Sequence, residues 1–111
     1  MIIITQGRYT SDAISGMIER PEDRATEARR LIEAAGGKFI ASYFTFGEFD
    51  FLVICEFDDI RAVTPALIAV AAGGAVSGLR TTVALNWSDG KAAFEKARDM
   101  GKSFRSAGRK K

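Results

Sequence analysis

The fold of this chain is decided by residues 39–57, which read FIASYFTFGEFDFLVICEF. Residues 39–46 alternate aromatic and smaller side chains, and residues 51–57 form a continuous apolar run; both patterns are typical of β-strands. The two strands are joined by Gly47-Glu48-Phe49-Asp50. Glycine tolerates positive φ and aspartate accepts bonds from backbone amides, so the stretch predicts a β-hairpin. The second strand is apolar on both faces, which indicates that both faces are covered.

Upstream of the hairpin, the sequence predicts one strand and then two helices. Residues 2–9 begin with β-branched side chains and form the strand. Residues 10–12 offer a cap for a short helix that ends at Pro21. Pro21 is expected to occupy the first turn of the next helix, which Gly36-Gly37 end.

Downstream of the hairpin, the pattern continues with a helix, a strand and a last helix. Residues 58–59 open the first of these helices, and Pro65 either kinks it or marks its start. Residues 76–87 predict the fourth strand, and Ser88-Asp89 are expected to cap an amphipathic helix over residues 88–105. Residues 106–111 are expected to be a disordered basic tail.

The predicted order is strand, helix, strand, strand, helix, strand, which is the split βαβ arrangement of a ferredoxin-like α+β domain. It places two helices on one face of a four-stranded antiparallel sheet over residues 1–87. A second copy is the simplest cover for the other face, so a homodimer is predicted. The helix at 88–105 is expected to pack on its own domain or on that partner.

Composition excludes several classes of chemistry. The 111 residues contain no histidine and one cysteine, Cys55, so imidazole ligation, zinc sites and iron–sulfur sites are excluded. No glycine-rich phosphate loop is present, and neither a metal nor a cofactor is expected. A lone cysteine fits a reducing compartment and no apolar run reaches about 20 residues, so a soluble cytoplasmic protein without a membrane span is predicted.

The charge is unevenly distributed along the chain. Residues 88–111 hold eight bases against three acids, whereas residues 1–87 hold eight bases against eleven acids. The basic segment lacks interleaved aromatics and a recognition motif, so a solubilising helix is favoured over one that binds nucleic acid or a membrane.

Two charged sets are candidate sites. Glu48 and Asp50 are either turn residues or paired carboxylates at a pocket mouth. Strands 2–9 and 51–57 are expected to run parallel at the centre of the sheet, so Arg8, Glu56 and Arg80 should meet at one end. That cluster is then either a structural ion-pair network or a clamp for a small carboxylate or phosphate.

Aromatic side chains offer a third candidate. Tyr9 and Tyr43, with the neighbouring aromatics, either line an apolar pocket between sheet and helices or belong to the core and interface. Cys55, mid-strand and without a histidine to activate it, is interpreted as a core residue.

Residues 43–54, YFTFGEFDFLVI, resemble the signature of the GYD family, small proteins of the dimeric α/β-barrel type. Supporting features are Glu19-Arg20, Gly36-Gly37 and Arg80-Thr81-Thr82. The resemblance covers residues 1 to about 87 and leaves the last helix outside. It implies the ferredoxin-like fold and the dimer. It implies no reaction, because the family has no well-defined one. Phe49 stands at the family's tyrosine, so a role for that phenol is not carried over.

The leading functional hypothesis is a homodimeric module that binds a small anionic or aromatic metabolite between sheet and helices. One alternative is a cofactor-independent enzyme, such as a monooxygenase, isomerase or decarboxylase, acting on a small aromatic or enolisable compound; it rests on fold analogy. Another is a structural or interaction domain that docks through its last helix.

Overall fold

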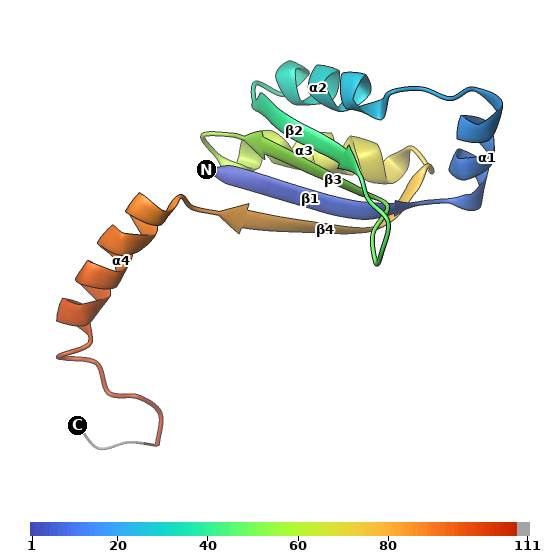
Figure 1. Ribbon diagram of the computed structural model, residues 1–111. Coiled ribbons are helices and arrows are strands. Elements are labelled where there is room, and N and C mark those ends of the chain that lie inside the picture. The colour runs from blue at the N-terminus through green and yellow to red at the C-terminus, as the bar shows by residue number, and fades with distance from the viewer. Residues whose placement is uncertain (109–111) are drawn as a thin grey trace.

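The computed structural model describes residues 1–108, within which the chain forms four strands and four helices. In chain order these are β1 (Ile2–Tyr9), α1 (Ser11–Glu19), α2 (Arg24–Ala34), β2 (Lys38–Phe44), β3 (Phe51–Glu56), α3 (Ile60–Ala72), β4 (Val76–Ala84) and α4 (Trp87–Met100). The strands form one sheet in the order β2-β3-β1-β4, with every neighbouring pair antiparallel. Helices α2 and α3 lie against one face of that sheet (Figure 1). The predicted ferredoxin-like α+β fold is therefore confirmed.

The direction of β3 corrects one prediction. Residues 2–9 and 51–57 were expected to run parallel, but β1 and β3 are antiparallel and Ile2 lies opposite Glu56. The helical crossover makes β1 and β2 parallel, and the hairpin then forces β3 to run against both. Because Arg80 lies opposite Gln6, at the other end of β1, the predicted cluster of Arg8, Glu56 and Arg80 does not form within the chain.

Four element boundaries differ from the predicted ones, and three of them do so because different residues cap the helices. Asn86, and not Ser88-Asp89, caps α4, since its Oδ1 accepts from the backbone N of Asp89 at 2.9 Å. This cap ends β4 at Ala84, before Trp87. Asp23 caps α2, which leaves Pro21 outside the helix whose first turn it was expected to occupy. Strand β2 ends at residue 44, two residues earlier than predicted.

Helix α3 contains Pro65 and begins before it. Asp59 caps the helix by accepting from Arg61 N at 2.8 Å, so Pro65 does not mark the start. The helix nevertheless turns Val63 and Ala66 inward, where both are buried.

The core lies between the sheet and the two helices. Its buried cluster consists of Ile3, Ile32, Cys55, Phe57 and Val63. Phe57 is 2% exposed and lies against Gly37, where a Cβ would come within 2.3 Å of the ring. Only glycine leaves room for that ring, so the Gly36-Gly37 pair that ends α2 also shapes the core.

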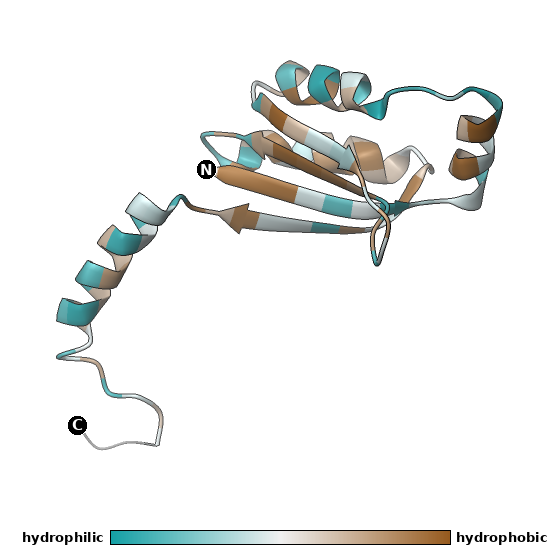
Figure 2. Ribbon diagram, viewed as in Figure 1, coloured by the Kyte–Doolittle hydropathy of each residue, from teal (hydrophilic) through white to brown (hydrophobic). Residues whose placement is uncertain are grey.

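The opposite face of the sheet carries no helix. The register places Ile2, Ile4, Leu52 and Ile54 on this side, away from the core residues Ile3 and Cys55. Figure 2 shows the apolar colour that marks the beginning of β1 and much of β3. We call this surface the open face; within residues 1–108 the helices leave it uncovered.

Helix α4 extends away from the sheet (Figure 1), and its packing on a partner stays a prediction. Its aromatic side chains Trp87 and Phe94 are 84% and 71% exposed. Of the predicted tail, residues 109–111 lie outside the described part of the chain. No helix within residues 1–108 is long and apolar enough to cross a membrane.

Candidate functional site

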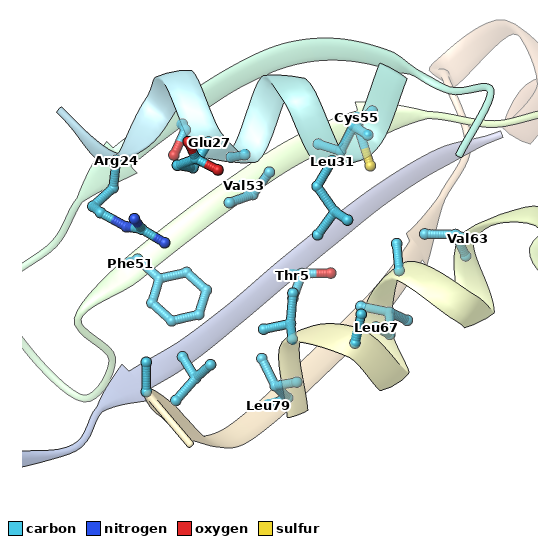
Figure 3. A pocket seen from close by; sticks show the side chains of 18 of the residues that line it. Thr5, Arg24, Glu27, Leu31, Phe51, Val53, Cys55, Val63, Leu67 and Leu79 are labelled. Carbon is cyan, nitrogen blue, oxygen red and sulfur yellow. The ribbon is translucent and has the colours of Figure 1, made fainter. Parts of the chain in front are cut away.

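A cavity of about 340 Å³ lies between the sheet and the pair formed by α2 and α3. The sheet supplies its floor, and each helix supplies one wall (Figure 3). Most of the lining side chains are apolar; they include Phe51, Val53 and Cys55 from the sheet, Ala28, Leu31 and Ile32 from α2, and Val63, Ala66 and Leu67 from α3. The hydroxyl-bearing side chains Thr5 and Ser42 add isolated polar groups. Such a space can bury a compact apolar molecule.

Phe51 lines the cavity because β1 is glycine at the position opposite. A Cβ on Gly7 would lie 2.7 Å from Cζ of the Phe51 ring, so any other residue there would displace the ring. The ring also contacts Tyr9, with 5.1 Å between ring centroids. Gly7 thus lets two aromatic side chains meet on the helix-covered side of β1.

The polar part of the lining comes from Tyr9, Arg24 and Glu27. Arg24 is the first residue of α2, and Figure 3 shows its guanidinium directed towards Phe51. It forms an ion pair with Glu22 at 3.0 Å, and Glu27 forms one with Arg30 at 3.0 Å. The cavity therefore combines an apolar interior with a cation, a carboxylate and a phenol.

Tyr9 presents a neutral hydroxyl. Burial raises its pKa above the ordinary value of 10.0, and this outweighs the lowering effect of Arg24. Its backbone N donates to Asp50 Oδ2 at 2.9 Å, which fixes the end of β1. Near neutral pH the phenol can donate or accept a hydrogen bond, but it is not ionised.

We expect Tyr9 to ionise above pH 10.0. The tyrosinate absorbance of the wild type minus that of Tyr9→Phe, followed against pH, should have its midpoint above pH 10.0. The folded state holds the proton more tightly than the unfolded chain does. Tyr9 therefore contributes stability below the ordinary pKa, and that contribution is lost as the pH rises through the raised one. A midpoint at or below 10.0 would mean that the ring is not desolvated.

Cys55 lies on the cavity floor and is 4% exposed. Burial raises the pKa of its thiol, so the sulfur stays protonated and poorly nucleophilic. The interpretation of this cysteine as a core residue is confirmed.

The structure places the other predicted site residues outside the cavity. Asp50 bonds the backbone of β1, as a turn residue would, and Tyr43 is 60% exposed on the open-face side. Glu56 stands at the far end of β1 from Arg8 and Arg80. Of the seven predicted residues, only Tyr9 lines the cavity.

Arg8, Glu48 and Arg80 form a second group, gathered by Phe49. The loop between β2 and β3 folds back across β1 towards β4, which brings Phe49 to both arginines (Figure 1). Arg8 Nε donates to the backbone O of Glu48 at 2.8 Å, and Arg8 Nη2 lies 4.0 Å from Glu48 Oε1.

Sequence reasoning missed Arg24 and Glu27, although helical spacing carried the signal. Arg24 precedes Ala28 by four residues and Leu31 by seven, so it shares their face of α2. A charged residue on the apolar stripe of a helix can indicate a binding site, and it can equally indicate that the end of the helix is exposed. The apolar members of the stripe, taken alone, indicate only a core-facing surface.

Comparison with known proteins agrees with this architecture. The GYD domain model matches residues 3–94, which extends the resemblance past residue 87 and into α4. Among curated proteins the sequence has no match.

Two solved structures have the same fold at low sequence identity. The hypothetical protein PHS023 from Pyrococcus horikoshii is 14% identical, with a TM-score of 0.50 over 78% of this chain and 92% of that one. TTHA0845 from Thermus thermophilus is 12% identical, with a TM-score of 0.51 over 77% and 92%. At these identities the likeness concerns the fold alone. The family match, which runs from the first strand into the last helix, shows that the chain belongs to the GYD domain family.

Proposed function

We propose that this protein is a homodimeric module that binds a small molecule with an apolar body and one polar or anionic end. The observation that carries the proposal is the cavity between α2 and α3, whose apolar lining is joined by Arg24 and Tyr9. An aromatic or aliphatic body would contact Phe51, Val53 and Leu31. Its polar end would meet the guanidinium and the phenol.

The size and chemistry of the cavity support this proposal. Its volume of about 340 Å³ lies in the range of small-molecule sites, about 300–1,000 Å³. A guanidinium can bind carboxylate, sulfonate or phosphate through charge-assisted hydrogen bonds. The raised pKa values of Tyr9 and Cys55 favour binding over catalysis, since neither side chain is a poised base.

We expect Ala28→Leu to weaken ligand binding at least about tenfold, or about 1.4 kcal/mol. Ala28 lines the cavity from α2, and leucine would fill part of it while keeping a good helix former. A suitable probe is 1-anilinonaphthalene-8-sulfonate, which joins an aromatic body to one anion. Its fluorescence on titration measures the affinity.

Ala34→Leu is the matched control, because it makes the same change on the exposed surface of the same helix. It should leave the affinity of the probe unchanged. If both variants bind the probe as the wild type does, the probe lies elsewhere and the cavity is not the site. Native mass spectrometry of gently purified protein would then show whether any other small molecule is retained.

The open face supports the homodimer. It presents Ile2, Ile4, Leu52 and Ile54 in adjacent rows, and a second sheet packed against it would remove these side chains from water. The partner would also cover the exposed side chains of α4, because a helix of 14 residues gains little stability without packing.

A further inference from the structure

Two arginines share one aromatic ring on the side of the sheet opposite the cavity. Phe49 is 8% exposed, and its ring centre lies 5.2 Å from Cζ of Arg8 and 5.1 Å from Cζ of Arg80. Arg8 comes from the end of β1, Arg80 from β4 and Phe49 from the loop between β2 and β3. Three separate segments thus hold two guanidinium groups near one ring, where cation–π attraction orients them.

Only one of these two arginines has an ion-pair partner within residues 1–108. The only ion pair of Arg8 within residues 1–108 is the one with Glu48, at 4.0 Å, and both side chains are at least half exposed. Arg80 forms no ion pair with any residue in that range. Asp50 Oδ2 accepts from the Tyr9 backbone N–H, and Asp50 forms no ion pair with either arginine within residues 1–108. Both cations contact the same ring, and their combined positive potential favours the approach of an anion.

Further hydrogen-bond donors lie next to Arg80. An open hollow there is lined by Gln6, Thr45 and residues 46–49 of the loop. Within residues 1–108, the backbone N–H groups of residues 46–49 donate no hydrogen bond. Loop amides beside a guanidinium are a common way to bind the oxygens of an anion.

We propose that Arg80, oriented by Phe49, binds a phosphate-type dianion in this hollow, with donors from Gln6 and the loop amides. Arg8, which contacts the same ring but does not line the hollow, adds a second positive charge nearby. The two guanidinium groups neutralise a double negative charge better than a single one. The site is separate from the cavity of the proposed function, because none of its residues lines that cavity.

The test is an NMR titration of the ¹⁵N-labelled full chain with inorganic phosphate, at ionic strength held constant with chloride. Saturable shifts are expected at the amides of residues 46–49 and at the Arg80 side chain. Arg80→Gln should weaken phosphate binding at least about tenfold. Glu48→Gln should strengthen it, because it removes the carboxylate that competes for Arg8. Acetate, with one charge, should bind more weakly than phosphate.

Arg61→Gln is the matched control. It removes the same charge at a residue already paired with Asp59 at 2.6 Å, at the start of α3. It should leave phosphate binding unchanged. Arg80→Lys keeps the charge but loses the planar group, so binding should fall while the shifts of distant amides stay native. Non-saturable shifts, or equal losses in Arg61→Gln and Arg80→Gln, would overturn the proposal.

Discussion

Replacing Phe57 with alanine is expected to lower the free energy of unfolding by about 3–5 kcal/mol. Phe57 is 2% exposed and belongs to the buried cluster with Ile3, Ile32 and Val63. Alanine would remove most of the apolar contact and leave a cavity against Gly37, which has no side chain to fill it. Small domains are stable by only about 5–15 kcal/mol, so the variant should be close to unfolding. Urea unfolding followed by circular dichroism measures the loss.

Phe46→Ala is the control for this change. Phe46 is 100% exposed in the loop after β2, so the same substitution there should alter stability by no more than about 0.5 kcal/mol. Equal losses at the two positions would contradict the packing described for Phe57.

Ile54→Lys is expected to convert the proposed dimer into a folded monomer. Ile54 lies opposite Ile4 on the open face, where a second copy would bury both. In a two-fold dimer of the proposed kind, each interface would bury two unpaired ammonium groups, each costing several kcal/mol. We expect the dissociation constant to rise at least about a thousandfold, or about 4 kcal/mol. Sedimentation velocity over a range of concentrations measures the change.

Ile68→Lys provides the comparison for the open face. Ile68 is 63% exposed on α3, away from the open face, so its replacement should leave the dimer intact. Dissociation by both variants would indicate general destabilisation. A wild type that sediments as a monomer at every concentration would refute the homodimer itself.

Local patterns in the sequence were enough to predict the elements and their order. The alternation at 39–46 and the apolar run at 51–57 identify the hairpin, and Gly36-Gly37 mark the end of α2. Caps were harder to predict, because Asn86, Ser88 and Asp89 are all capping residue types. The hydrogen bond from Asp89 N to Asn86 distinguishes them, and it depends on where β4 leaves the sheet.

The candidate site was only partly predictable, because it depends on long-range geometry. The predicted contact between Arg8 and Glu56 does not form, because β3 runs antiparallel to β1. Glu56 therefore lies opposite Ile2, at the other end of β1 from Arg8. The proximity of Arg8 and Arg80 was anticipated, but Phe49 between them was not. It depends on the loop folding back over the sheet, and no local pattern encodes that path.

The cavity and the core share side chains, and this restricts how the protein can change. Ile32, Cys55 and Val63 belong to the buried cluster and also line the cavity. A substitution that reshapes the floor therefore also loosens the fold, so selection for a new ligand would be opposed by selection for stability. Arg24 is exposed and Tyr9 and Glu27 are only partly buried, so the three are freer to vary. Proteins built this way would therefore change their ligand preference mainly by substitution at these polar positions, while the residues of the cavity floor stay the same.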